Sequence, residues 1–272
     1  MKYKLVKKLN KKISTIGLGT WSLSNTQNSK FFYKKISKKK IIEILNKSYD
    51  YGVNYYDTSP AYGRSENFLG EVFKNKRDKI IISSKIGLSK FGDKIDFAIS
   101  ALEKQLYNSL KNLKTDYLDI VYFYNPEFKK YDFSKSYEFI KKQQEKGIIK
   151  TVGISFKSPN EIKNIKKKFS FDFAQCNFNI LDNRIYDKKI MKYLIENDVH
   201  VIARTVLGLG ILTETNYINN YKFNKGDIRS NFSKQQINLW KNGIDEINDY
   251  YRSMSKIGIG RNINYFCKKI KD

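Results

Sequence analysis

The sequence is poor in the residues that build metal centres and disulfide frameworks. Its 272 residues include two cysteines, Cys176 and Cys267, and a single histidine, His200. The cysteines lie far apart and form no CxxC pair, so we predict neither a metal site nor a disulfide framework. We expect both cysteines to be reduced thiols in the core.

Long apolar runs are missing as well. No stretch approaches the roughly 18 apolar residues that a membrane-spanning helix requires, and the charged opening MKYKLVKKLNKK contains no apolar signal segment. These features predict a cytoplasmic protein that does not insert into a membrane. Because 40% of the residues are hydrophobic, the chain can bury a large core. We expect residues 1–272 to form a single domain.

Acidic side chains are few relative to basic ones. Asp and Glu number 27 against 52 Lys and Arg, which leaves a net charge of +25. Clustered positive charge would favour a polyanionic partner, but the lysines are spread along the whole chain and are interpreted as ordinary surface residues. No specific nucleic acid partner is predicted, whereas an anionic small substrate is compatible with this charge.

What the sequence does contain is an alternation of short β-branched runs and helix-period segments, which indicates βα units around a parallel sheet. Apolar residues at helical spacing occur over 95–113 and over 237–254, and each stripe predicts a helix. The segments 3–6 and 11–14 are expected to pair as a small hairpin that closes the floor of a barrel. Seven short, largely apolar strands are predicted at 14–19, 53–57, 80–85, 117–124, 149–155, 173–175 and 199–205.

Three polar residues mark the ends of two of these strands. Asp57 ends the second strand, Tyr62 follows five residues later within GVNYYDTSPAYGRSENFLG, and Lys85 ends the third strand. In a parallel barrel the carboxyl ends of the strands are the expected place for catalytic residues. These three side chains are therefore candidate site residues at one end of the predicted barrel.

This arrangement resembles the aldo-keto reductase family, and further matches extend the resemblance from Gly17 to Gly210. They include the segments GLGTW at 17–21, LKTDYLDI at 113–120, GIIKTVGIS at 147–155 and FAQCNFN at 173–179. The resemblance implies a (β/α)8 TIM-type barrel. The stretch from Gly258 onward is similar to the helix that precedes the family's eighth strand, so we expect the eighth strand and final helix to be lacking.

The resemblance implies roles for the residues at the predicted barrel mouth. Tyr62 would be the general acid or base, and the ammonium of Lys85 would favour its phenolate, because a phenol with a pKa near 10 is a poor proton donor at neutral pH. Asp57 would hold Lys85 charged and oriented. Tyr124 takes the place of the family's histidine at the end of the fourth strand, where its hydroxyl can still donate a hydrogen bond. Trp21 would line the substrate pocket.

The resemblance also implies a nicotinamide cofactor, either NADP(H) or NAD(H). Phe156 replaces the asparagine that usually helps to hold the carboxamide, and the absent C-terminal part would carry the site for the adenosine phosphate, so we expect weak cofactor binding or none. A sheet without its eighth strand would leave open edges, which makes a homodimer an expectation. The residues expected to bind the cofactor are Gly19, Thr20, Ser155, Gln175, Arg204, Thr205, Leu207 and Gly208.

Three functions are compatible with these features. The first is hydride transfer between nicotinamide and a carbonyl or alcohol. The second is proton transfer without redox chemistry, as in elimination or epimerisation of a sugar-like substrate at the same site. The third is a binding or scaffold role with impaired catalysis. The expected substrate-selecting loops, 23–35, 128–133 and 214–232, have no readable chemistry, and His200 is expected at the opposite end of the barrel.

Overall fold

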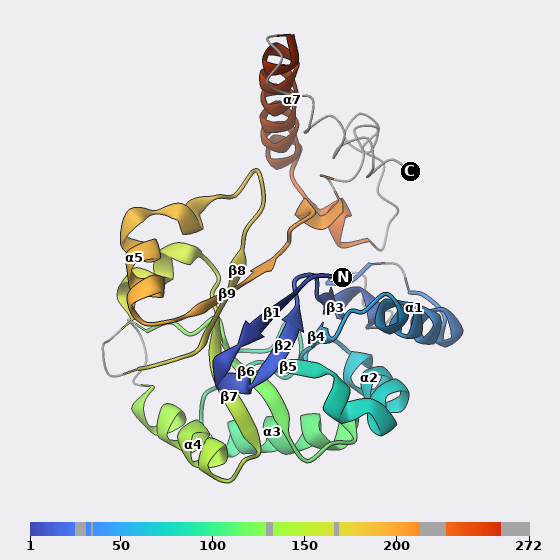
Figure 1. The fold of residues 1–272 in the computed structure, drawn as a ribbon, viewed down its shortest axis with the longest axis vertical. Helices are drawn as coiled ribbons and strands as arrows, with labels where there is room; N and C mark the ends of the chain where they lie inside the picture. Colours follow the sequence, from blue (N-terminus) through green and yellow to red (C-terminus); the bar gives the residue numbers. More distant parts are fainter. Residues whose placement is uncertain are drawn as a thin grey trace.

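The computed structural model describes residues 1–24, 31–33, 35–128, 133–165, 169–210, 212 and 227–256. Seven parallel strands form one sheet in the order β3-β4-β5-β6-β7-β8-β9 (Figure 1). The predicted (β/α)8-type barrel is thus confirmed in its seven strands. No further barrel strand follows β9 among the described residues, and the stretch from Gly258 lies outside them. The strands are Leu18–Gly19 (β3), Tyr55–Asp57 (β4), Ile81–Ile86 (β5), Leu118–Tyr124 (β6), Ile149–Ser155 (β7), Phe173–Asn177 (β8) and His200–Arg204 (β9).

The predicted and observed strands differ most at the first one. Residues 14–19 were expected to form a single strand, but Ser14 ends β2 (Lys11–Ser14), a strand of the amino-terminal hairpin, and only Leu18 and Gly19 join the barrel sheet. The reason is a side-chain anchor between the two segments. The backbone N–H of Ser14 donates to Oδ1 of Asn54 at 2.7 Å, which holds β2 over the entry of β4.

The hairpin of β1 (Tyr3–Val6) and β2 covers the amino-terminal end of the barrel, as predicted. Val6 and Ile13 pack in one cluster with Ile81, Ile120 and Phe173, which lie at or near the starts of β5, β6 and β8. An ion pair adds to this contact, because Lys11 Nζ lies 3.0 Å from Oδ1 of the buried Asp119. Oδ2 of the same carboxylate lies 2.7 Å from Arg77. The chemistry expected at the opposite end is therefore separated from this closed floor.

Helices surround the sheet on its outer side (Figure 1). Helix α3 begins at Ile99, later than the predicted stripe at Ile95, because the Asp96 side chain accepts the backbone N–H of Ala98 and forms a turn there. The second predicted helix is present as α7, which stands at one end of the molecule beyond β8 and β9 (Figure 1). The α-helices are Lys38–Asp50 (α1), Ser65–Phe73 (α2), Ile99–Leu113 (α3), Ser134–Glu145 (α4), Lys188–Glu196 (α5) and Lys234–Lys256 (α7). Short 3-10 turns lie at Lys7–Leu9, Trp21–Leu23, Lys74–Lys79, Pro159–Asn164, Arg184–Tyr186, Gly208–Gly210 and Ile228–Asn231.

The core lies mainly between the sheet and these helices. All six residues of β5 are buried, as expected for a parallel strand covered on both faces. Helix packing is close where α2 crosses α3: a Cβ placed on Gly70 would lie 2.4 Å from the backbone oxygen of Asn112. Cys176 is a free, buried thiol as predicted, and burial raises its pKa to about 11. Cys267 lies outside the described residues.

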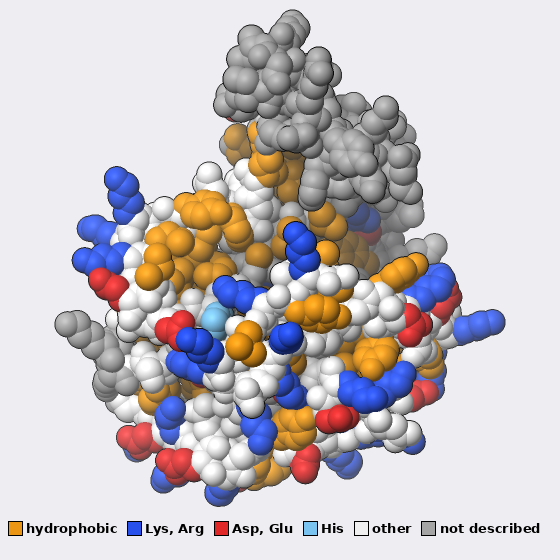
Figure 2. Space-filling model, in the orientation of Figure 1, with side chains coloured by type: hydrophobic (Ala, Val, Ile, Leu, Met, Phe, Trp, Pro, Cys, Tyr) orange, Lys and Arg blue, Asp and Glu red, His pale blue; other side chains and the backbone are white. Residues whose placement is uncertain are grey.

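The face of the molecule seen in Figure 2 shows mixed charge rather than one basic patch. On the face seen in Figure 2, Lys and Arg side chains are scattered among acidic and polar ones. That distribution agrees with the interpretation of the lysines as ordinary surface residues. Within the described part of the chain, none of the helices combines the length and apolarity that spanning a bilayer demands.

Candidate active site

A buried ion pair joins β4 and β5 at the carboxyl end of the barrel. Lys85 Nζ lies 2.8 Å and 2.7 Å from the two carboxylate oxygens of Asp57, and it also donates to the backbone oxygen of Thr58 at 2.8 Å. The Lys85 side chain is 1% exposed and that of Asp57 is 16% exposed. Burial lowers the pKa of Lys85, and the adjacent Asp57 carboxylate opposes that effect. The pairing expected from the sequence is present, and the three hydrogen bonds of the Lys85 ammonium all go to Asp57 and Thr58.

Tyr62 lies beside this pair, in the loop between β4 and α2. Lys85 Nζ is 4.8 Å from the centroid of the Tyr62 ring, and the ring stacks on Phe91 at 6.0 Å between centroids. The sequence predicted that Lys85 would lower the pKa of Tyr62, but that pKa is raised well above 10. Burial is the largest cause and the charge of Asp57 adds to it, while Arg204 opposes both.

The physical reason for this correction is the burial of the Tyr62 phenol, to which the charge of Asp57 adds. Lys85 faces the ring of Tyr62, and its charge is already neutralised by Asp57. Tyr62 is therefore protonated at neutral pH. It can donate a proton to a developing alkoxide, and the positive charge that favours its phenolate comes from Arg204.

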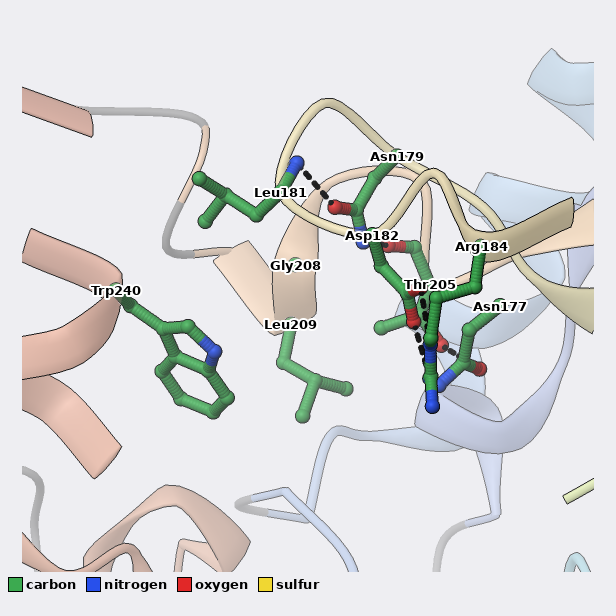
Figure 3. Close-up of a pocket in the computed structure, with 9 residues that line it drawn as sticks. All are labelled: Asn177, Asn179, Leu181, Asp182, Arg184, Thr205, Gly208, Leu209 and Trp240. Atoms are coloured by element: carbon green, nitrogen blue, oxygen red, sulfur yellow. Dashed lines mark hydrogen bonds and ion pairs between the residues drawn. The ribbon is translucent and has the colours of Figure 1, made fainter. Parts of the chain in front are cut away.

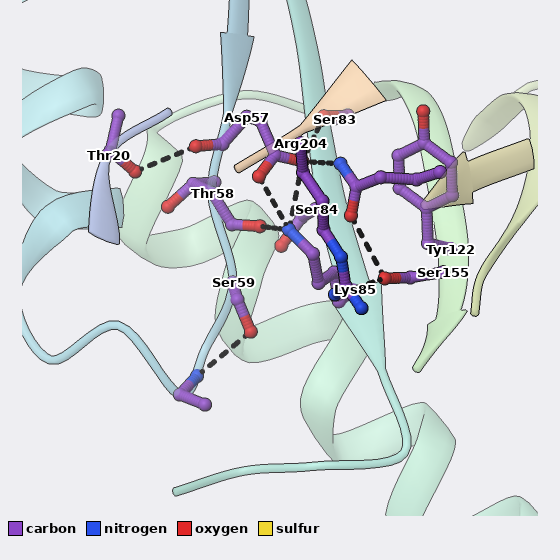
Figure 4. A network of polar contacts seen from close by, with 12 residues as sticks. Thr20, Asp57, Thr58, Ser59, Ser83, Ser84, Lys85, Tyr122, Ser155 and Arg204 are labelled. Atoms are coloured by element: carbon purple, nitrogen blue, oxygen red, sulfur yellow. Dashed lines mark hydrogen bonds and ion pairs between the residues drawn. The ribbon is translucent and has the colours of Figure 1, made fainter. Parts of the chain in front are cut away.

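A chain of polar contacts runs from this pair across the mouth of the barrel (Figure 4). Asp57 Oδ1 accepts from Gln175 Nε2 at 2.8 Å, Gln175 Oε1 accepts from the Ser155 hydroxyl at 3.0 Å, and Arg204 Nη1 donates to that hydroxyl at 3.3 Å. Strand register explains the sequence of contacts, because Ser155 pairs with Gln175 and Arg204 pairs with Asn177. The network thus brings together four residues that the sequence had assigned to two separate roles.

Several members of this network could not be found by motif. Asn177 accepts from Arg204 Nε at 3.0 Å and from the Thr205 hydroxyl at 3.1 Å. Ser83 donates to Asp57 Oδ1 at 2.9 Å and is bonded in turn to the buried Tyr55 hydroxyl at 3.0 Å. The alternation of strand side chains could have indicated Ser83 and Asn177, because each lies two residues from a predicted site residue on the same strand face.

Two residues expected to bind cofactor, Gly19 and Thr20, lie at the end of β3 and contact Asp57. The Thr20 hydroxyl donates to the backbone oxygen of Asp57 at 2.9 Å and is fully buried, so it fixes the strand that carries the acid. Gly19 pairs with Asp57 across β3 and β4. Phe156, which replaces the family's asparagine, is also fully buried and packs on Phe171 in the outer core. Its backbone oxygen faces the mouth instead, where Arg204 Nη2 donates to it at 2.6 Å.

Aromatic side chains form one wall of the site. Trp21 packs on Phe32 and Tyr33, with ring centroids 6.4 Å and 5.2 Å away, and Phe32 packs in turn on Phe91 at 5.6 Å. Phe91 also stacks on the ring of Tyr62, so this row of aromatic rings reaches Tyr62. The loop that contains Phe32 and Tyr33 was expected to have no readable chemistry, and here it supplies apolar surface. The indole nitrogen of Trp21 is buried without a hydrogen-bond partner among the described residues.

Tyr124 ends β6 and is half-buried, and its charged form would raise the pKa of Tyr62. The two phenols therefore lie within electrostatic reach of each other.

His200 opens β9 and contacts the ring of Phe173 at 5.4 Å, at the amino-terminal end of the barrel where the sequence placed it. It is remote in the fold from the strand ends that carry Asp57 and Lys85.

A pocket of about 260 Å³ opens between the ends of β8 and β9 and helix α7 (Figure 3). The predicted cofactor residues Thr205 and Gly208 line it, and the predicted Leu207 lies on the surface of the same loop, 56% exposed. The remaining lining was not predicted and consists of Asn177, Asn179, Leu181, Asp182, Arg184, Leu209 and Trp240. Thr205 and Leu209 both have positive φ, at 57° and 60°, a strained backbone that is common at functional sites.

A family model for aldo/keto reductases matches residues 15–259. An uncharacterised oxidoreductase from Bacillus subtilis (strain 168) is 29% identical over 209 residues, which cover 74% of this chain and 63% of that relative. An aldo-keto reductase from the same organism is 26% identical over 269 residues, covering 97% and 78%. A solved aldo-keto reductase from Bacillus halodurans, in its holo form, is 25% identical with a TM-score of 0.68, covering 78% and 68%.

The alignment spans less than two thirds of the first relative's length. The family model, in contrast, covers most of this chain, and its range includes every residue of the network around Asp57 and Lys85. The chain belongs to the aldo/keto reductase family.

Proposed function

We propose that this protein is a nicotinamide-dependent oxidoreductase that interconverts a small carbonyl compound, aldehyde or sugar-like, and the corresponding alcohol. The observation that carries the proposal is the convergence of the Asp57–Lys85 ion pair with the Tyr62 ring at the carboxyl end of the barrel. Family membership supports the same reaction class.

The residues at the mouth are compatible with a nicotinamide cofactor. The Ser155 hydroxyl is bonded to the amide of Gln175 and to the guanidinium of Arg204, so three polar groups lie together there. Thr205, which follows Arg204, lines the pocket together with Gly208. Phe156 offers no amide there, so the Arg204 guanidinium is the available N–H donor beside Ser155. When bound, the cofactor would supply or accept the hydride.

In this proposal, Tyr62 transfers the proton. As hydride adds to the carbonyl carbon, the oxygen becomes an alkoxide and takes the proton from the Tyr62 hydroxyl, and alcohol oxidation reverses both transfers. The raised pKa of Tyr62 keeps the proton in place until charge develops on the substrate. Lys85 and Asp57 are positioning residues that fix the face of the Tyr62 ring, and Tyr124 is a second hydroxyl donor for the substrate oxygen.

The test is cofactor binding and turnover with the purified protein. We expect NADPH or NADH to bind in a fluorescence titration, and their oxidation at 340 nm to depend on an added aldehyde. Tyr62→Phe should bind cofactor normally and lose turnover by about 100-fold to 10,000-fold, the range for a positioned general acid. Tyr107→Phe, the same change on the exposed face of α3, is the matched control. Near-normal turnover in Tyr62→Phe would refute the assignment.

A second candidate function is proton transfer without redox chemistry, as in epimerisation of a sugar-like substrate. One observation favours it. Phe156 stands where a side-chain amide would help to hold the nicotinamide carboxamide, and its ring is buried in the outer core instead. Absence of binding at millimolar NADPH and NADH would exclude the redox proposal and leave this one. Exchange of a substrate C–H for deuterium in D2O, lost in Tyr62→Phe, would then support it.

A further inference from the structure

Arg204 is a cation held by neutral groups. Its Nε donates to Asn177 Oδ1 at 3.0 Å, its Nη1 to the Ser155 hydroxyl at 3.3 Å and its Nη2 to the Phe156 backbone oxygen at 2.6 Å. Among the ion pairs of the described residues, none includes Arg204. A guanidinium has five N–H donors, so two remain for a ligand.

The charge of Arg204 is not compensated by its neighbours in the site. Lys85 has the Asp57 carboxylate as its counter-ion at 2.7 Å, whereas the three acceptors around Arg204 are an amide, a hydroxyl and a peptide oxygen. Arg204 is only partly exposed. Desolvating a charge without a counter-ion costs free energy, and a guanidinium is well suited to a planar carboxylate. The site thus has one excess positive charge and donors to match an anion.

Arg204 also lies near the reacting groups. From β9 it extends past β8 to the end of β7, and the network joins it through Ser155 and Gln175 to Asp57 (Figure 4). Burial is the main influence on the pKa values of Tyr62 and Lys85, raising the first and lowering the second, and the charge of Arg204 lowers both. An anion bound by Arg204 would therefore sit within electrostatic reach of the proton donor.

We propose that Arg204 binds a carboxylate carried by the substrate, so that the preferred carbonyl compound of this enzyme is an oxo acid. The inference rests on the proposed function. The three bonds that pin the guanidinium hold its remaining donors in a fixed position, which sets the separation between the bound carboxylate and the carbonyl that faces Tyr62. The net charge of +25 would attract such substrates. A phosphate of the cofactor is also an anion that a guanidinium can bind, so the experiment must distinguish it from a carboxylate of the substrate.

The test compares aldehydes of the same shape that differ in charge. Formylbenzoates, with the carboxylate at position 3 or 4, are matched by the 3- and 4-methylbenzaldehydes, and their rings suit the aromatic wall. We expect kcat/KM of the unaltered protein to favour at least one formylbenzoate over its methyl counterpart by about 10-fold to 100-fold. Arg204→Met should abolish this preference mainly through KM, and Arg204→Lys should retain part of it. Arg64→Met, a surface guanidinium, is the matched control.

A cofactor titration separates the two sources of the anion. In Arg204→Met we expect the Kd values of NADPH and NADH to rise equally and by no more than about 10-fold, the effect of one lost hydrogen bond to the nicotinamide that both cofactors share, while the preference for the acid is lost. A large loss of NADPH affinity with an unchanged preference for the acid would place a cofactor phosphate at Arg204 and overturn the inference. Equal turnover of acid and methyl aldehydes overturns it while the proposed function stands. No turnover of any aldehyde with either cofactor overturns both.

Discussion

Asp57→Asn should destabilise the protein strongly, because Asp57 is the counter-ion of a lysine that is 1% exposed. Asp57 Oδ1 accepts from Lys85, Ser83 and Gln175, and Oδ2 accepts a second bond from Lys85. An asparagine can retain one oxygen, but its amide nitrogen would then face either these donors or the ammonium. Removing one partner of a buried pair costs about 3–5 kcal/mol in free energy of unfolding, or about 6–20 °C in Tm for a domain of this size.

The assay is urea unfolding followed by circular dichroism, at pH 7 and at pH 9.5. Asp57 raises the pKa of Lys85 against the lowering effect of burial, so Asp57→Asn lowers that pKa further below its unfolded value. The unfolded state then binds more protons than the folded state between the two pKa values, and stability rises with pH. We therefore expect the deficit of Asp57→Asn to shrink at pH 9.5.

A double-mutant cycle with Lys85→Met isolates the pair. Once the ammonium is removed, Asp57→Asn should cost much less than it does alone. Ser83→Ala is the matched control, because it removes one neutral donor to the same oxygen and should cost about 1 kcal/mol at either pH. A cost of Asp57→Asn below about 1 kcal/mol, the level of an exposed pair, would refute the role of this buried pair, as would a cost that simply adds to that of Lys85→Met.

Two further predictions concern the packing of helix α2 behind the site. Burial raises the pKa of Glu66, whose carboxylate accepts from Ser84 at 2.8 Å and from Asn112 at 3.2 Å, so its stabilising contribution at low pH is lost as pH rises through its folded pKa. Glu66→Gln should therefore gain in Tm relative to the unaltered protein between pH 5 and pH 8, and parallel Tm curves would contradict this. Gly70→Ala should cost about 1–3 kcal/mol in urea unfolding, because its Cβ would lie 2.4 Å from the Asn112 backbone oxygen. Gly19→Ala, whose Cβ would have no atom within 4 Å, serves as the control for stability, and equal costs would contradict the prediction.

Periodicity and strand-end residues were sufficient to predict most of the fold. The seven strands were located because buried parallel strands are short apolar runs, and β7 was predicted with its observed bounds, Ile149–Ser155. Errors of a few residues arose where a side chain changed the path of the backbone. The hydrogen bond from Ser14 to the Asn54 side chain keeps Ser14 in the hairpin. The turn that Asp96 forms with Ala98 precedes α3, so this helix begins at Ile99.

The sequence by itself determined the family, the barrel and the grouping of Asp57, Tyr62 and Lys85, since strand-end positions in a parallel sheet necessarily meet at one mouth. Only the tertiary structure decided how these groups interact. It placed the ammonium of Lys85 against Asp57 and over the Tyr62 ring. It also buried the Tyr62 phenol, and this burial raises the pKa of Tyr62 rather than lowering it. It also set Arg204 across the ends of β7 and β8 without a carboxylate partner among the described residues. Both outcomes depend on burial and on distances between side chains from different strands, which linear spacing does not encode.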